Sequence, residues 1–564
     1  MNPNGKTLRW IWNVSGKTKK YVFLLMTVKI VYALTGVLYA LLLKRVINSA
    51  TGQSSDSLLS SLLYFAGLIG STVILQAFIR YLTERSRAEL EKKLREQLFA
   101  QLLTRDYASV CGSHTGEWMN RMSSDVSVVM SGITQIAPDF SESIVRILSA
   151  AATLVVMMPG LMFALLAGGL AIAGISLLFR KKLKTYHMRI QSAGGKVRSF
   201  VLESIQSLPV IHSFNREKKM QDSASELMQK HVDVRMERMR FVNLCNVVVS
   251  AAMQGAQFLG VALCGWMILR GQMSYGSMSA ILHLVGQLES PLAGISKYIP
   301  QYYSMIASAE RLMEPEAYAK DAEKAPKPEE EIRRFYHNDF AALHLDNISF
   351  SYRNDEENSV LDQVSFTLKK GCSLAIIGES GCGKSTLLKI LLGLYKADQG
   401  AALLETVSGE KITLDTEYRN LFAYVPQGNL LFSGTVREML SFSDKTLMYD
   451  DEKLWNALRI AAADEIISQR PDGLDAILGE GGRGFSEGQI QRLAIARAIL
   501  FERPILLFDE ATSSLDEDTE RKVLNNIKEM TGYTVILVTH KEASRTACDC
   551  RLDLASYKND TATK

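Results

Sequence analysis

The sequence predicts a multi-domain chain in which an all-α, six-helix transmembrane domain is followed by a soluble α/β domain. Two observations support this fold class. Long apolar segments recur over the first half of the chain, whereas short β-rich stretches alternate with amphipathic helices in the second half. We expect a transmembrane domain with long cytoplasmic helices at 1–314, a polar linker at 315–340 and the α/β domain at 341–564.

Composition excludes several classes of protein. The chain has 564 residues with 64 Lys and Arg against 60 Asp and Glu, and a formal net charge of +4 does not support a nucleic-acid partner held by a basic field. Its seven cysteines are scattered and lack the paired spacing of a zinc site, so neither a disulfide framework nor a structural zinc ion is expected. Most of the soluble mass is therefore expected in a reducing compartment.

Six membrane spans are expected before the linker. The first, 21–43, follows a basic N-terminal stretch, and a helix of that length reaches ~35 Å, which is enough to cross a bilayer. The other candidates are 58–82, 128–158, 160–179, 242–269 and 278–305. Between spans lie two long charged segments, 83–127 and 180–240, and the second carries fourteen Lys or Arg against six Asp or Glu. The positive-inside bias puts both segments and both chain termini in the cytoplasm.

The two cytoplasmic segments are expected to extend the spans as helices. Leucines recur at four-residue steps from Leu90 to Leu102, with charges between them. The alternative is a solvated coiled segment. Breaks at 105–107 and 207–209 predict a short cross-helix near the far end of each segment.

Charged residues within the spans are candidates for contact with a transported molecule. Asp139, Glu142 and Arg146 share one helical face of the third span. Because an intramembrane charge is costly unless it is paired or wetted, this set is either a substrate contact or a self-paired structural cluster. A second set, on one face of the sixth span, comprises Glu289, Lys297 and Gln301.

The most specific motif is a glycine-rich loop that follows an apolar strand and opens an apolar helix. Glycines let backbone N–H groups curve around a phosphate, Lys384 would neutralise the β and γ oxygens, and Ser385 would ligate Mg²⁺. Strand, loop and helix occur in the required order, which predicts a P-loop NTPase fold and a bound nucleoside triphosphate. The residues expected to hold it are Gly378, Glu379, Ser380, Gly381, Cys382, Gly383, Lys384, Ser385 and Thr386.

A second apolar strand, 505–508, ends in two carboxylates, Asp509 and Glu510. The carboxyl edge of a parallel sheet is where α/β proteins place their ligands. Asp509 suits the Mg²⁺ shell, and Glu510 is positioned to deprotonate or orient the water that attacks the γ-phosphate. An acidic pair after a strand is often only structural, and its place behind the phosphate loop favours the catalytic interpretation.

Further motifs resemble those of ATP-binding cassette (ABC) proteins. The segment 485–489 reads Phe-Ser-Glu-Gly-Gln and resembles the family's signature, and Tyr352, Gln427, Asp516 and His540 lie in motifs that occur in the family's order. With six spans ahead of one cassette, the chain looks like an exporter-type half-transporter. The resemblance covers nearly the whole chain, and the joint occurrence of these motifs is very specific.

The resemblance implies a role for each matching residue. Tyr352 would stack on adenine, which suits an aromatic face. Gln427 would sense Mg²⁺ and the attacking water, and would thus join Ser385 and Asp509 around the metal ion. His540 would contact the γ-phosphate and hold Glu510 with its water, and Asp516 would communicate across a dimer of cassettes. The residues that would complete the ATP site of a second chain are Ser486, Gly488 and Gln489.

The sequence departs from the family's pattern in two places. Phe485 and Glu487 replace the usual Leu and first Gly of the signature. Glu487 adds a negative charge where a γ-phosphate is expected, unless its side chain points to solvent, so an effect on turnover is expected more than one on ATP binding. In addition, the family's closing strands look degenerate after His540.

The expected function is ATP-driven transport of a small molecule, peptide or lipid across the plasma (inner) membrane by alternating access, with ATP and Mg²⁺ as cofactors. The N-terminus and the nucleotide-binding domain would be cytoplasmic. The partner is a second half-transporter chain, and the presence of both Glu510 and His540 favours a homodimer, with a heterodimer left open. The alternatives are an exporter-fold importer of a metal chelate or siderophore and an ATP-gated channel or regulator.

Overall fold

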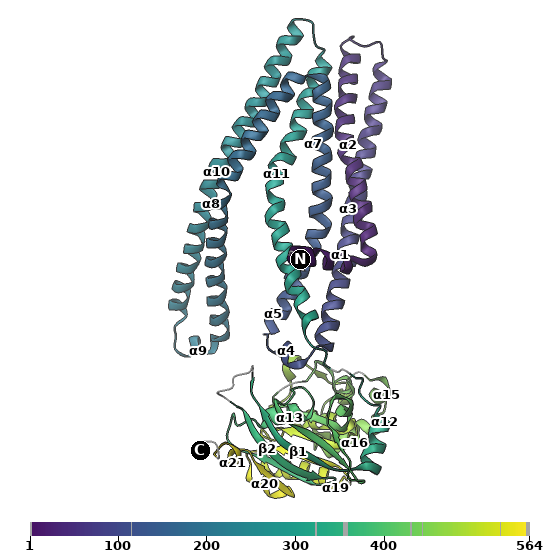
Figure 1. Cartoon of the computed structure of the whole chain (residues 1–564), viewed down its shortest axis with the longest axis vertical. Coiled ribbons are helices and arrows are strands. Elements are labelled where there is room, and N and C mark those ends of the chain that lie inside the picture. The colour runs from purple at the N-terminus through teal and green to yellow at the C-terminus, as the bar shows by residue number, and fades with distance from the viewer. Residues whose placement is uncertain are drawn as a thin grey trace. The chain divides into compact units, whose positions relative to one another are not determined.

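The computed structural model describes residues 3–113, 115–321, 324–352, 359–428, 431–442, 444–530 and 532–559. The chain divides into two compact units. The first unit is Met1–Leu98 with Trp118–Glu314, and the second is Phe99–Glu117 with Pro315–Lys564. Figure 1 shows long helices in the first unit and a mixed α/β body in the second. A segment from the helical half of the sequence, Phe99–Glu117, therefore folds with the second unit.

The first unit is built from long helices, which the apolar sequence favours; α2, α3 and α10 contain no internal proline. Two π-helical turns join α5, α6 and α7 into one continuous helical segment. The described residues of this unit therefore form six long helical segments. The helices are α1 (Pro3–Ser15), α2 (Lys19–Ala50), α3 (Leu58–Thr104), α5 (Thr115–Asn120), α6 (Val126–Ser131), α7 (Ala137–Met157), α8 (Pro159–Gln206), α9 (Leu208–Ser213), α10 (Glu217–Leu269) and α11 (Tyr275–Met313).

Among the residues that the structure describes, three of these helical segments are long and apolar enough to cross a membrane. They are Gly5–Ala50, Leu58–Thr104 and Thr115–Met157, and they contain the predicted spans 21–43 and 58–82 and all but the last residue of 128–158. The other three predicted spans fall in α8, α10 and α11, where many side chains, including those of Glu289 and Lys297, lie outside the described residues. As predicted, α3, α8 and α10 continue as helices through the charged segments.

The bundle of the first unit has its core between α2, α7, α10 and α11. Ala40, Leu154, Ile281 and Leu284 are fully buried there. α8 packs mainly along α10, and Figure 1 shows this pair diverging from the bundle toward α9. The two cross-helices predicted at the breaks are confirmed as α9 and, in the second unit, α4 (Tyr107–Cys111).

The second unit contains an antiparallel and a parallel sheet. The antiparallel order is β2 (Leu361–Lys369), β1 (Phe340–Phe350), β4 (Gln399–Thr406) and β5 (Lys411–Thr413). The parallel order is β11 (Cys550–Asp553), β3 (Ser373–Ile377), β10 (Thr534–Val538), β9 (Ile505–Asp509) and β6 (Phe422–Val425). The strands predicted at 374–377, 422–425, 505–508 and 535–538 are confirmed as β3, β6, β9 and β10.

The prediction of degenerate closing strands is wrong at β11, which pairs in parallel with β3. Leu552 is buried against the sheet, whereas Arg551 and Asp553 are exposed. A strand of four residues with one inward apolar side chain gives only a weak sequence signal, because its stability comes from the neighbouring strand.

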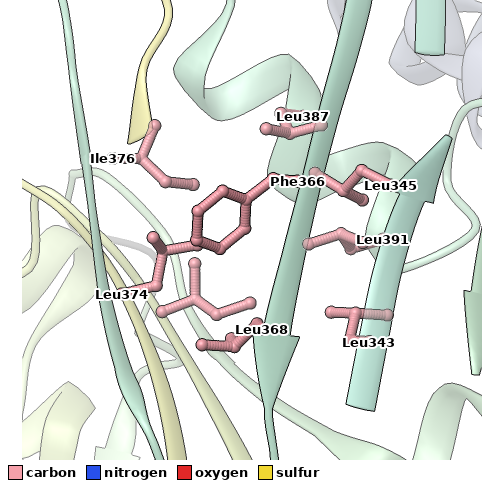
Figure 2. Close-up of a pocket in the computed structure, with 9 residues that line it drawn as sticks. Leu343, Leu345, Phe366, Leu368, Leu374, Ile376, Leu387 and Leu391 are labelled. Atoms are coloured by element: carbon pink, nitrogen blue, oxygen red, sulfur yellow. The ribbon is translucent and has the colours of Figure 1, made fainter. Parts of the chain in front are cut away.

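Helix α13 packs against both sheets. Figure 2 shows the small apolar cavity where they meet, with Phe366 of β2 among leucines of β1, β3 and α13. The helices of this unit are α12 (Glu329–Arg334), α13 (Lys384–Leu391), α14 (Val436–Ser441), α15 (Lys445–Met448), α16 (Asp451–Ile460), α17 (Asp464–Ser468), α18 (Glu487–Leu500), α19 (Glu517–Glu529), α20 (Glu542–Ala547) and α21 (Ala555–Asn559). The short strands β7 (Gly434–Thr435) and β8 (Ile477–Leu478) pair with each other.

The segment Phe99–Glu117 is held by backbone, side-chain and aromatic contacts within the second unit. The Asp106 N–H donates to the carbonyl of Ala319 (2.9 Å), and Arg105 Nη1 donates to the carbonyl of Tyr318 (2.9 Å). Tyr107 of α4 packs edge-on against Tyr395, with ring centroids 5.7 Å apart. Burial, together with Cys111, raises the pKa of Tyr107 to about 12.

Candidate active site

The phosphate-loop residues lie between β3 and α13. Gly378, Gly381 and Gly383 have φ angles of 146°, 82° and 102°, a region that L-residues rarely adopt. At Gly383 a Cβ would also lie 2.7 Å from Leu361 Cδ2, so only glycine fits there without a shift. Gly383 caps the N-terminus of α13, whose free N–H groups and positive dipole end favour an anion at the loop.

Lys384 is buried, with 5% of its surface exposed, although it carries a charge. Its Nζ donates to the carbonyls of Gly378 and Glu379, at 2.9 Å each. A buried ammonium needs such partners, and here they come from the phosphate loop itself.

Ser385 and Asp509, two of the residues predicted to bind Mg²⁺, are in direct contact. Ser385 Oγ donates to Asp509 Oδ1 (2.8 Å), and the Tyr424 hydroxyl donates to Asp509 Oδ2 (3.1 Å). Only 2% of Asp509 is exposed, and this burial raises its pKa, with the two hydrogen bonds opposing the rise. Burial and the nearby Asp509 charge also raise the pKa of Tyr424. A buried carboxylate beside a serine hydroxyl is a donor set that fits Mg²⁺.

Glu510 stands at the end of β9 in a left-handed conformation, with φ of 52°. Its carboxylate lies between two side chains from neighbouring strand ends. Gln427, after β6, donates from Nε2 to Glu510 Oε2 (2.7 Å), and His540 Nε2, after β10, lies 3.2 Å from Glu510 Oε1. Because β6, β9 and β10 are adjacent and parallel, their carboxyl ends bring the three predicted catalytic residues together.

Tyr352 lies beside the start of α13. Its hydroxyl shares a hydrogen bond with Thr386 Oγ1 (2.8 Å), and its ring packs edge-on against Phe350 and Tyr395. The side chain is 43% exposed, so part of the ring is open to a planar ligand. Tyr395 thus touches both Tyr352 and Tyr107 of α4.

The signature residues form the N-terminus of α18. Ser486 caps the helix in a capping box: its N–H donates to Gln489 Oε1 (3.0 Å), and its Oγ accepts from the Gln489 N–H (3.4 Å). A Cβ on Gly488 would lie 2.9 Å from the carbonyl oxygen of Ser514. Glu487 is exposed at the first residue of the helix. Among the described residues no hydrogen bond or ion pair joins this group to the phosphate loop of the same chain.

Asp516 is the N-cap of α19. Its carboxylate accepts from the Thr519 N–H (2.9 Å), and hydrogen bonds from Thr519 lower its pKa. Sequence reasoning missed Tyr424, which contacts Asp509, and also Gln491 and Lys541, which hydrogen-bond to the loop between Glu510 and Asp516. Tyr424 alone carried a signal, because a tyrosine in a strand predicted as buried needs a partner for its hydroxyl.

A phosphate loop with its carboxylates, following a set of long apolar helices, defines an ATP-driven membrane transporter. Comparisons with known proteins support the same class of protein. A family profile for the ABC transporter transmembrane region matches residues 22–292, and one for the ABC transporter matches residues 361–513. An ATP-dependent lipid A-core flippase of Pseudomonas fluorescens is 30% identical over 453 residues, which cover 79% of this chain and 73% of the flippase. The chain therefore belongs to the ABC transporter family.

Two further relatives support the half-transporter architecture. An uncharacterised ABC transporter ATP-binding protein of Bacillus subtilis, YwjA, is 27% identical over 83% of this chain and 80% of its own. The structure of a bacterial Atm1-family ABC exporter with ATP bound superposes with a TM-score of 0.77 at 19% identity, covering 97% of this chain and 99% of that one. The predicted fold class, an exporter-type transmembrane domain fused to a nucleotide-binding domain, is confirmed. This family membership implies ATP binding, hydrolysis coupled to transport, dimerisation and a bilayer.

Proposed function

We propose that two copies of this chain form a transporter that exports a small molecule, peptide or lipid across the plasma membrane by alternating access. The observation that carries the proposal is the carboxylate of Glu510, held between Gln427 and His540 beside the Ser385 and Asp509 pair. The domain limits 1–314, 315–340 and 341–564 and a cytoplasmic N-terminus and nucleotide-binding domain belong to this proposal.

In the proposed reaction, Glu510 orients or deprotonates the water that attacks the γ-phosphate. His540 lies close enough to keep the Glu510 carboxylate in place, and in this proposal it would also donate to the γ-phosphate. Gln427 donates to the second carboxylate oxygen, which has a further lone pair free to accept from a water. Ser385 and Asp509 would hold Mg²⁺, which supplies positive charge against the β and γ oxygens when bound. Tyr352 supplies the aromatic face for adenine.

A second chain completes each ATP site in this proposal. Ser486 and Gly488 stand at an exposed helix N-terminus that makes no described hydrogen bond to its own phosphate loop, which supports a role in the site of a partner. Glu510 and His540 are both present in this chain, so a homodimer would have two competent sites. Mass measurement of the purified transporter in lipid, with the chain expressed alone, tests the homodimer directly.

The proposed substrate class is tested by transport into inside-out vesicles, with lipids, peptides and siderophores as candidates. The flippase relative makes a lipid the first candidate. ATP-dependent accumulation inside such vesicles supports export. Release of preloaded siderophore from them would support the importer alternative, and flux far faster than ATP turnover would support a channel.

The role of Glu510 is tested by Glu510→Gln in the lipid-embedded dimer. Glutamine keeps the size of the side chain but cannot accept the proton, so ATP should still bind while turnover falls by about 10²–10⁴-fold. Glu517→Gln is the matched control, because Glu517 lies on the exposed face of α19 and is 76% exposed. ATPase activity equal to wild type in Glu510→Gln would overturn the assignment.

A further inference from the structure

The loop 511–516 connects the proposed catalytic carboxylate to α19. It begins directly after Glu510 and ends at Asp516, the N-cap of that helix. Ala511, Thr512 and Leu515 are buried, so the loop is packed into the unit. The side chains of Lys541 and Gln491 hydrogen-bond to this loop. Neither residue has a proposed role in the reaction.

Lys541 holds the loop from one side and follows His540 directly in the sequence. Its Nζ donates to the carbonyls of Leu515 (2.6 Å) and Thr512 (3.0 Å). The same ammonium forms an ion pair with Glu520 of α19 (3.2 Å), whose side chain is fully buried. Glu520 in turn accepts a hydrogen bond from Thr512 Oγ1 (2.8 Å). Lys541 therefore links both the loop and α19 to the segment that contains His540.

Gln491 of α18 holds the loop from the other side. Its Oε1 accepts from the Ser514 N–H (3.0 Å), and its Nε2 donates to Ser513 Oγ (3.1 Å). Gly488 approaches the Ser514 carbonyl so closely that a side chain there would collide. The signature helix, the loop and the His540 segment are consequently tied together by hydrogen bonds, with Lys541 and Gln491 as the two attachments.

We propose that Lys541 is a positioning residue for ATP hydrolysis. By holding the 511–516 loop through two carbonyls and Glu520, it fixes where His540 stands relative to Glu510. A displacement of about 1 Å in a catalytic group can cost about 10²-fold in rate, so a loose attachment lowers the rate of the chemical step. Lys541 makes no described contact with the phosphate loop, so ATP binding does not depend on it. This inference rests on the ATPase function proposed above.

The test uses a double substitution, because Lys541→Met alone would leave a fully buried carboxylate beside no ammonium and could unfold the unit. Lys541→Met with Glu520→Gln removes both charges and retains an acceptor for Thr512, so it deletes chiefly the two donations to the loop carbonyls. In the lipid-embedded dimer we expect kcat for ATP to fall about tenfold or more, with KM and the Kd for ATP within about twofold of wild type. Lys541→Arg should keep kcat within about threefold, because arginine can also donate to both carbonyls.

A control variant and a separate test of the ATPase proposal distinguish the outcomes. Lys522→Met removes an exposed lysine of α19 and should leave kcat and KM at wild-type values. Wild-type kcat in the double variant, or a loss of ATP affinity as large as its loss of kcat, overturns the positioning role. The ATPase proposal fails separately, if Glu510→Gln hydrolyses ATP as fast as wild type.

Discussion

Lys29→Met tests whether the charged cluster between α2 and α7 is structural. Lys29 forms ion pairs with Asp139 and with Glu142 (3.5 Å), and Glu142 also accepts a hydrogen bond from Arg146 Nη2 (2.6 Å). Two cations thus face two carboxylates, and the cluster has no net charge. The side chains of Lys29 and Glu142 are only 12% and 19% exposed, so their charges depend on one another more than on solvent.

The magnitude follows from which partner is lost. Breaking a fully buried ion pair costs about 3–5 kcal/mol. Here Arg146 still serves Glu142, and Asp139 is 31% exposed, so we expect Lys29→Met to lower the free energy of unfolding by about 1–3 kcal/mol. Adding Asp139→Asn to Lys29→Met restores neutrality and should recover most of that loss.

Thermal unfolding of the dimer in lipid nanodiscs measures these differences, with substrate-stimulated ATPase activity measured on the same samples. Lys20→Met, at an exposed position of α2, is the matched control. A structural cluster predicts that the single variant is less stable and that the double variant recovers. Unchanged stability in both, together with lost stimulation by substrate, would refute this reasoning and make the cluster a substrate contact instead.

Three further predictions concern the second unit. Glu487→Gly should raise ATP turnover about two- to fivefold in a phosphate-release assay, because it removes a negative charge from a helix N-terminus proposed to face phosphate, and an unchanged or lower rate would contradict this. Burial raises the pKa of Asp509. Above the folded pKa its carboxylate is charged and lowers the free energy of unfolding, whereas below about 3.9, the usual unfolded pKa, it is protonated in both states and has no such effect. Nucleotide-free Asp509→Asn should therefore unfold at a higher temperature than wild type at pH 7, with the difference shrinking toward pH 4; a constant difference would argue against a titrating Asp509. Tyr107→Ala should speed amide exchange across α4 by removing the ring that packs on Tyr395, whereas Tyr107→Phe should not.

Features that lie within one short stretch of the sequence could be predicted. The phosphate loop could be placed because strand, glycines and helix occupy one short segment, and the cross-helices because breaks at 105–107 and 207–209 interrupt long helical patterns. The resemblance to ABC proteins implied that Gln427 and His540 act beside Glu510, and the adjacent parallel strands β6, β9 and β10 explain why the three residues meet at one sheet edge.

Contacts between distant segments could not be predicted in the same way. No partner for Lys29 could be read from the sequence, because its pairing with Asp139 joins residues 110 positions apart. Lys541 gave no signal, because its role depends on the carbonyls of a loop about 26 residues earlier in the chain. The membership of Phe99–Glu117 in the second unit was not predicted either, because its backbone and side-chain contacts are made with residues far along the chain.

The docking of Phe99–Glu117 into the second unit has a consequence for biosynthesis. Arg105 and Tyr318, which bond to each other, are separated by 213 positions. A ribosome that adds ~5–20 residues per second reaches Tyr318 about 10–40 s after Arg105. During that interval the nascent chain carries α4 with no docking site yet made. A gene fragment beginning at Pro315 would conversely yield a cassette whose Tyr395 surface is missing its natural cover, so such a truncated product should be more prone to aggregate than the full chain.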